Sequence, residues 1–204
     1  MRAAVQGRLR TGYDWARRWR SLVRRRVTGI DTVDEVRGRW RSEPSGTRSL
    51  HRILPEDEVA PDDVFVDFGS GKGAVLLQAA RYPFKRVVGV EIEPAHGEVA
   101  AANLARADAR RRTGEVELVT ADVEGFHVPD DLTIAYFYNP FGAEAFRRVV
   151  ERLVESARRR PRRIRVIYRY PKHEGVLLEH GFRRRRRRRG LTPGSVTCLY
   201  ELEA

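Results

Sequence analysis

The chain is poor in cysteine, histidine and lysine, and it has no long apolar run. Its single cysteine, Cys198, cannot form an internal disulfide, and its five histidines lack the spacing of a zinc site, so the sequence favours neither a disulfide framework nor a bound metal. No apolar stretch approaches the roughly 20 residues that a membrane-spanning helix needs, and the N-terminus lacks the apolar core of a secretory signal. These absences predict a protein of the reducing cytoplasm.

The charge is strongly positive and comes almost wholly from arginine. Lysine and arginine together number 40 against 28 acidic residues, a net charge of +12, yet the only lysines are Lys72, Lys85 and Lys172. A charge of this size attracts anionic partners such as nucleic acid or an acidic surface. A general preference for arginine over lysine would give the same count, so the composition alone does not identify a partner.

Two segments are expected from the pattern along the chain. Residues 1–27 have apolar residues three or four positions apart among arginines and tryptophans, which predicts a basic amphipathic helix. Such a helix can pack on the domain as a lid, lie on a membrane surface or contact nucleic acid. Residues 28–47 are rich in loop-forming types. We therefore expect 1–54 to form a basic helix with a lid or substrate loop, and 55–204 to form one globular domain.

Within 55–204, strand and helix patterns alternate regularly. This predicts an α/β fold of the Rossmann-like, doubly wound type, with a mostly parallel seven-stranded sheet covered on both faces. Because the last two predicted strands have no room for a helix between them, they should form a C-terminal antiparallel hairpin. The strands are predicted at 63–68, 86–91, 116–120, 132–138, 163–169, 182–188 and 195–202. The helices are predicted at 49–54, 74–82, 94–108, 142–158 and 172–180.

Seven consecutive arginines, Arg183 to Arg189, form the one low-complexity run. In isolation such a block suggests disorder or phosphate binding. Here it lies in the first strand of the predicted hairpin, which favours a solvated edge strand whose aliphatic stems cover the sheet. Binding of phosphate groups stays open as the alternative.

The most informative segment is Val64 to Gly73, where an apolar strand leads into three glycines at alternate positions. Without a Cβ, glycine lets the backbone turn tightly and lie close to a ligand. The predicted helix after the turn would present free N–H groups there. This arrangement predicts a cradle for a small polar ligand at the end of the first strand.

Three ligand classes use a glycine-rich turn of this kind, and their spacing differs. A nucleotide P-loop is excluded, because it needs glycine at position 66 and Ser or Thr at position 73, where the chain has Val66 and Gly73. A dinucleotide fingerprint can be fitted only with alanine, Ala74, as its third member and Glu91 as the ribose-binding acid. Asp67 disfavours a dinucleotide, because a carboxylate there would repel a pyrophosphate but attract an ammonium group.

Four motifs that follow one another along the chain point to the third ligand class. These are Val66 to Gly73, then Gly89-Val90-Glu91, then Ala121-Asp122-Val123, and last Asn139-Pro140-Phe141. In this order they resemble the class I S-adenosylmethionine-dependent methyltransferases over about residues 60–202, with some likeness to the catalytic domain of the non-SET histone lysine methyltransferases.

That resemblance implies a cofactor, S-adenosyl-L-methionine, and a set of binding residues. The glycine loop with Asp67 would hold its methionine part, Glu91 its ribose hydroxyls, and Asp122 with Val123 would border the adenine. The full set of cofactor-binding residues that it implies is Asp67, Gly69, Ser70, Gly71, Gly73, Glu91, Ile92, Asp122 and Val123.

The acceptor side is expected at the end of the fourth strand. There the Asn139 amide oxygen can accept a hydrogen bond from an amino group, and Tyr138 or Phe141 can place an aromatic face beside a cation. Members that modify base amines or planar amides usually carry two prolines, whereas this chain has Pro140 alone. The sequence therefore predicts a methyltransferase (EC 2.1.1.-) with a nitrogen acceptor, using Tyr138, Asn139, Pro140 and Phe141. The alternatives are a nicotinamide-dependent reductase and a noncatalytic basic protein that binds nucleic acid.

Overall fold

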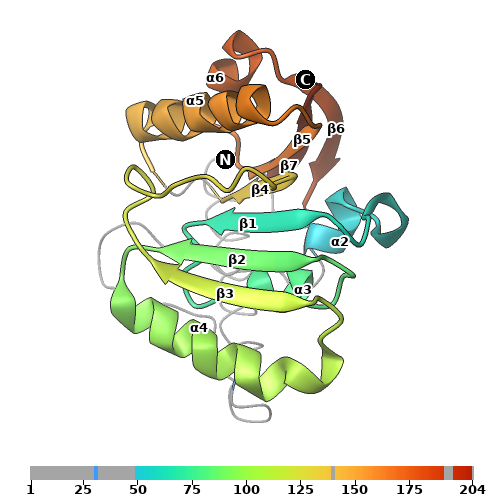
Figure 1. Cartoon of the computed structure of the whole chain (residues 1–204), viewed down its shortest axis with the longest axis vertical. Coiled ribbons are helices and arrows are strands. Elements are labelled where there is room, and N and C mark those ends of the chain that lie inside the picture. Colours follow the sequence, from blue (N-terminus) through green and yellow to red (C-terminus); the bar gives the residue numbers. More distant parts are fainter. Residues whose placement is uncertain (1–29, 32–48, 139–140, 191–194, 204) are drawn as a thin grey trace, which may run out of the picture.

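A seven-stranded sheet forms the centre of the molecule (Figure 1). The computed structural model describes residues 30–31, 49–138, 141–190 and 195–203, and the fold is given for these residues. The strand order is β3-β2-β1-β4-β5-β7-β6. In chain order the strands are β1 Val64–Phe68, β2 Arg86–Glu91, β3 Glu115–Thr120, β4 Ile134–Phe137, β5 Ile164–Arg169, β6 Arg183–Arg189 and β7 Val196–Leu202.

The first five strands are parallel, and β7 runs antiparallel to both β5 and β6. Strands β1, β4 and β5 are buried along their whole length, as expected for the centre of a sheet with covered faces. The chain order reverses between β1 and β4. In open α/β sheets this reversal, at the carboxyl ends of the strands, is where ligands bind.

Helices cover both faces of the sheet. One face packs against α5 and α6 through Phe146, Leu153 and Leu177, and the other packs against α2 and α3 through Leu50 and Leu76. In Figure 1, α5 and α6 lie beside the β4–β5 half and α4 lies along β3. The helices are α2 Ser49–Ile53, α3 Leu76–Ala79, α4 Pro94–Ala107, α5 Ala143–Arg159 and α6 Glu174–Glu179, with short 3-10 turns η1 Glu56–Glu58 and η2 Asp108–Arg110.

The fold class predicted from the sequence is confirmed, including the parallel sheet and the C-terminal hairpin. The predicted helix 74–82 is shorter, because the chain stays in turns from Gly71 to Val75 and becomes helical only over Leu76–Ala79. The helix start at which we expected free N–H groups is therefore not at Ala74, where the chain forms a turn, but at Leu76. The predicted N-terminal helix and loop lie outside the described residues apart from Ile30 and Asp31.

The arginine run forms the edge strand β6, and all but Arg186 of its residues are exposed. Arg186 donates to both carboxylate oxygens of Glu58, at 2.7 and 3.1 Å, and to the Ile53 carbonyl at 2.7 Å, which ties the edge strand to α2 and η1. Arg184 pairs with Glu174, and Arg185, at a bulge, pairs with Glu201 and Glu203. A solvated edge strand is thus what the structure shows.

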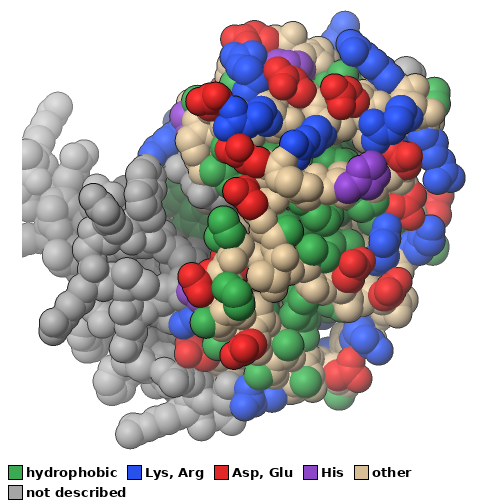
Figure 2. Space-filling model, turned by 60° about the vertical axis from the view of Figure 1, so that its left-hand side comes forward, with side chains coloured by type: hydrophobic (Ala, Val, Ile, Leu, Met, Phe, Trp, Pro, Cys, Tyr) green, Lys and Arg blue, Asp and Glu red, His purple; other side chains and the backbone are tan. Residues whose placement is uncertain are grey.

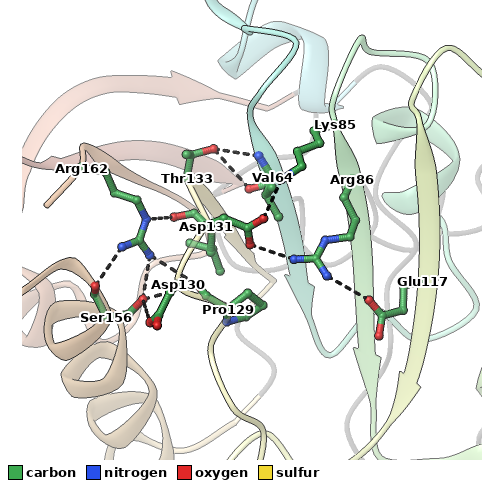
Figure 3. Close-up of polar contacts among 11 residues, drawn as sticks. Val64, Lys85, Arg86, Glu117, Pro129, Asp130, Asp131, Thr133, Ser156 and Arg162 are labelled. Carbon is green, nitrogen blue, oxygen red and sulfur yellow. Dashed lines mark hydrogen bonds and ion pairs between the residues drawn. The ribbon is translucent and has the colours of Figure 1, made fainter. Parts of the chain in front are cut away.

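Polar side chains hold the amino ends of β1, β2 and β4 together (Figure 3). Arg86 reaches Asp131 at 2.8 Å and Glu117 at 3.4 Å. Thr133 exchanges hydrogen bonds with the backbone of Val64, and Arg162 donates to the Leu132 carbonyl at 2.6 Å. This network fixes the segment that enters β4, at the edge of the sheet opposite the one where open α/β sheets bind ligands.

In the part of the chain that the structure describes, no helix has both the length and the apolar character needed to cross a membrane.

Candidate functional site

The glycine loop turns sharply at the carboxyl end of β1. Gly69, Gly71 and Gly73 all have positive φ, at 80°, 52° and 77°, a conformation that L-residues with a side chain rarely adopt. The backbone N–H groups of Gly69 and Ser70 both donate to the Val90 carbonyl, at 2.8 and 3.0 Å, which holds the loop against the end of β2. The tight turn predicted from the spacing of the glycines is present, and its role as a ligand cradle stays a prediction.

Asp67 lies just below this loop, on β1, with 3% of its surface exposed. Burial raises the pKa of its carboxyl well above the ordinary value, and repulsion by the Glu91 carboxylate raises it further. No hydrogen bond from a described residue offsets these effects. A buried acid beside a second acid is stabilised by a cation, so the site suits a ligand with an ammonium group.

Glu91 ends β2 and faces the loop. Its carboxylate accepts hydrogen bonds from the backbone N–H of Gly71 at 2.8 Å and of Glu93 at 3.1 Å, and His96 lies 3.7 Å away. A carboxylate has about four lone-pair positions, so two backbone bonds leave room to accept from ligand hydroxyls. The contact with Gly71 was not predicted, and it shows that this side chain also braces the loop.

The remaining cofactor-binding residues that the resemblance implies are Ile92 and the two assigned to adenine, Asp122 and Val123, and they lie around the next strand ends. Ile92 has 64% of its surface exposed, unusual for a large apolar side chain, and offers an apolar surface beside Glu91. Asp122 is exposed and caps its own turn by accepting from the Glu124 N–H at 2.9 Å. Val123 is half-buried against the core, and its carbonyl accepts from Arg152 at 3.2 Å. Of these three residues, only Ile92 presents a large exposed apolar side chain.

Sequence reasoning did not find Asn103, a fully buried residue of α4. Its amide nitrogen donates to the Lys72 carbonyl at 2.9 Å and to the Asp31 carbonyl at 2.5 Å, while its oxygen accepts from the Asp31 N–H at 2.9 Å. This one side chain joins the glycine loop, α4 and the segment at Ile30 and Asp31. An amide among the alanines of the predicted helix was the available signal.

The acceptor motif is described only in part, because Asn139 and Pro140 lie outside the described residues. Tyr138 is half-buried directly after β4, and its ring stacks on Tyr170 with centroids 5.6 Å apart. Phe141 packs edge-on against Phe137 and tilted against Phe146. Phe141 therefore contributes to the core beneath α5, whereas Tyr138 lies at the carboxyl edge.

Figure 2 brings forward the side to which β1, β2 and β3 point in Figure 1. Acidic, basic and hydrophobic side chains are interspersed on this face. The described part of this face thus shows no continuous basic patch.

Comparison with protein families matches residues 65–161 to a family described as a methyltransferase domain. The match begins inside β1, spans the glycine loop, Glu91 and the end of β4, and ends after α5. It covers slightly less than half of the 204 residues. A search of curated proteins found no significant match.

Solved structures share the fold. An RNA methyltransferase from Salinibacter ruber, in complex with S-adenosyl-L-homocysteine, has 21% identity and a TM-score of 0.59, over 79% of this chain and 93% of that one. Magnesium protoporphyrin IX methyltransferase from Synechocystis PCC 6803, with bound cofactor, has 18% identity and a TM-score of 0.59, over 76% of each chain. A putative RNA methyltransferase from Pyrococcus horikoshii has 17% identity and a TM-score of 0.57, over 89% of this chain and 98% of that one. At these identities the likeness establishes a Rossmann-like methyltransferase fold.

Proposed function

We propose that this protein is an S-adenosylmethionine-dependent methyltransferase that acts on a nitrogen atom. One observation carries the proposal: a positive-φ glycine loop joins two carboxylates, Asp67 and Glu91, at the carboxyl ends of β1 and β2, next to the point where the strand order reverses. The methyltransferase-domain match over residues 65–161 and the cofactors of the similar structures support S-adenosylmethionine as the ligand.

The described residues fit this cofactor in three respects. The buried Asp67 carboxylate, which no described group neutralises, suits the ammonium of the methionine part. Glu91 keeps lone pairs for two ribose hydroxyls, and Ile92 offers an apolar face to the adenine. Gly69, Ser70, Gly71 and Gly73 would let the amino-acid end lie against the backbone, and Asp122 and Val123 would border the base.

The bound cofactor supplies a methyl group on a positively charged sulfur, which a nitrogen lone pair can displace directly. In that displacement a new N–C bond would form as the S–C bond breaks, the electron pair would go to sulfur, and the acceptor nitrogen would release its proton to solvent. The protein needs no covalent intermediate, and its main task is alignment of the reactants, an effect worth roughly 7–11 kcal/mol of barrier. In this proposal the Asn139 amide oxygen would accept a hydrogen bond from the acceptor's amine, and Pro140 would restrict the backbone next to it.

The aromatic neighbours have secondary roles in the same proposal. A ring face of Tyr138 or Phe141 near the sulfonium would contribute about 0.5–2 kcal/mol. The acceptor is a lysine side chain, another amine or a small molecule. The similar structures include an RNA methyltransferase and a porphyrin methyltransferase, so they favour none of these acceptors over the others.

An anionic partner is a further part of the proposal. Among the described residues, Arg183, Arg187, Arg188 and Arg189 of β6 form no ion pair with a carboxylate and are exposed. These four charges would add a salt-dependent attraction to a nucleic acid or acidic surface, which weakens steeply as salt rises.

Calorimetric titration of the purified full chain tests the activity class. We expect S-adenosylmethionine and S-adenosylhomocysteine to bind with micromolar affinity and to compete, while NADH does not bind. Gly71→Arg, which places a long side chain in the loop, should abolish the heat of binding. Binding of NADH in place of S-adenosylmethionine would support the reductase alternative, and binding of neither would remove the enzyme hypothesis.

Asn139→Ala tests the acceptor side separately. We expect cofactor affinity to stay within a few-fold of wild type, while methyl transfer from labelled cofactor to protein, RNA and small-molecule fractions of a cell lysate is lost. Unchanged transfer by Asn139→Ala would refute the role of this amide.

A further inference from the structure

Two arginines on β5 lie on the same face of the sheet, and only one of them has a counter-ion. Arg165 and Arg169 are 3% and 8% exposed and are separated by Ile167, which belongs to the core beneath α2 and α3. Arg165 donates to the Asp63 carboxylate at 2.7 Å and to the Glu58 carbonyl at 2.6 Å. Arg169, at the carboxyl end of the strand, forms no ion pair with any carboxylate of the described residues, and its buried Nε has no hydrogen-bond partner.

Two tyrosine rings lie beside the Arg169 guanidinium. Its Cζ lies 4.6 Å from the ring centroid of Tyr138 and 5.7 Å from that of Tyr170, and the two rings stack on each other at 19°. Burial lowers the pKa of Arg169, but the neighbouring tyrosines outweigh this and raise it, Tyr170 in part through a side-chain hydrogen bond, so the group stays charged. A ring face attracts a desolvated cation far less strongly than a hydrogen-bonded carboxylate does. The tyrosines therefore orient the guanidinium but do not replace a counter-ion.

The backbone beside Arg169 is strained. Tyr170 has φ of 52°, and it is the one residue other than glycine with positive φ in the described part of the chain. A bulky residue in this region is unfavourable, and such strain persists where the surroundings hold it, often at binding sites. Here it places the Tyr170 ring against the Tyr138 ring and beside the Arg169 guanidinium.

Arg169, Tyr138 and Tyr170 lie at the same edge of the sheet as the proposed cofactor residues, but on different strands. The register pairs Phe68 of β1 with Phe137 of β4, and Phe137 with Tyr168 of β5. Adjacent strands are about 4.8 Å apart, so Arg169 lies about 10 Å along the carboxyl edge from the start of the glycine loop. Since Asp67 and Glu91 mark the β1–β2 side, the β4–β5 side is left for the methyl acceptor.

We propose that Arg169, oriented by Tyr138 and Tyr170, binds an oxyanion of the methyl acceptor, either a carboxylate or a phosphate group. The planar guanidinium presents parallel N–H donors that match two oxygens of either group. The acceptor is then an anionic molecule whose charged end sits over β5 while its reactive atom lies toward β1. This inference rests on the proposed function for the identity of the acceptor, but the oxyanion site itself is independent of it.

The test uses the full chain saturated with S-adenosylhomocysteine, with sodium acetate and inorganic phosphate as probes at ionic strength held constant with sodium chloride. The thermal unfolding midpoint is followed as each probe is added, because a ligand that binds the folded state raises it. Three variants are compared with wild type: Arg169→Gln, Arg169→Lys and Arg158→Gln. The last removes the same charge from an exposed position of α5, away from β6.

We expect one probe to stabilise wild type and Arg158→Gln saturably, and which one does so distinguishes carboxylate from phosphate. Arg169→Gln should weaken binding of that probe by at least about tenfold. Arg169→Lys keeps the charge but loses the two parallel N–H donors, so its affinity for the probe should lie between those of wild type and Arg169→Gln. Equal stabilisation of Arg169→Gln and wild type, or no saturable effect of either probe on wild type, would overturn the proposal.

Titration of S-adenosylhomocysteine into each variant is the companion measurement. Wild-type affinity in Arg169→Gln shows that the variant is folded and that the residue does not hold the cofactor. Absence of S-adenosylhomocysteine binding to wild type would count against the proposed function alone, because the probe titrations can be repeated on the free chain.

Discussion

Gly73→Ala tests whether the shape of the glycine loop depends on its glycines. At φ of 77° an alanine pays the cost of a left-handed conformation, about 1–2 kcal/mol. Its Cβ would also lie 3.1 Å from the Cβ of Ala100, a fully buried residue of α4, so the loop or the helix must shift by a few tenths of an ångström. We therefore expect the free energy of unfolding to fall by about 1–3 kcal/mol.

The control lies in α4 itself. Gly97 has no positive φ, and an added Cβ would meet only the Thr120 hydroxyl at an ordinary 3.7 Å. Gly97→Ala should therefore raise stability by up to about 1 kcal/mol, as expected for a helix interior. Urea unfolding followed by circular dichroism measures both variants, and equal m-values would show that the unfolded states are comparable. If Gly73→Ala were as stable as Gly97→Ala, the loop would not have the strained shape on which the site depends.

Two further changes test the charges around the sheet. Arg165→Met leaves the Asp63 carboxylate buried without its partner, so the free energy of unfolding measured in urea should fall by about 3–5 kcal/mol. Adding Asp63→Asn should restore part of this loss. A loss below about 1 kcal/mol for Arg165→Met would contradict the pairing. Asp67 has a raised pKa in the fold, so its contribution to stability is largest at low pH and is lost as pH rises from about 3.9, its unfolded value, through the folded pKa. Asp67→Asn should thus be more stable than wild type at pH 7 while losing cofactor affinity, and a variant that is less stable yet binds normally would refute both parts.

Local patterns predicted most of the fold. Each strand of the sheet was located within a few residues. Buried parallel strands such as β1 and β4 read as apolar runs, and the helices between strands show a clear period. The short α3 was not foreseen, since the turns from Gly71 to Val75 depend on how the loop packs against β2 and α4. The edge position of β6 was predicted correctly from the lack of room for a helix before β7.

The candidate site was predictable only where the residues are close in sequence. The glycine loop and Asp67 belong to one segment, and Glu91 follows one helix later. The role of Asn103 needs α4 to lie against the loop, and the burial of Arg169 needs β5 to lie beside β4 so that Tyr138 meets it. These are contacts between distant segments, and no local pattern contains them.

A crystal structure of the full chain with S-adenosylhomocysteine tests the central claim most directly. The account predicts the ligand's ammonium beside the Asp67 carboxylate, its amino-acid end against the Gly69 to Gly73 backbone, and both ribose hydroxyls on Glu91. A structure in which protein atoms fill this space, or in which the loop instead binds a pyrophosphate group, would contradict it.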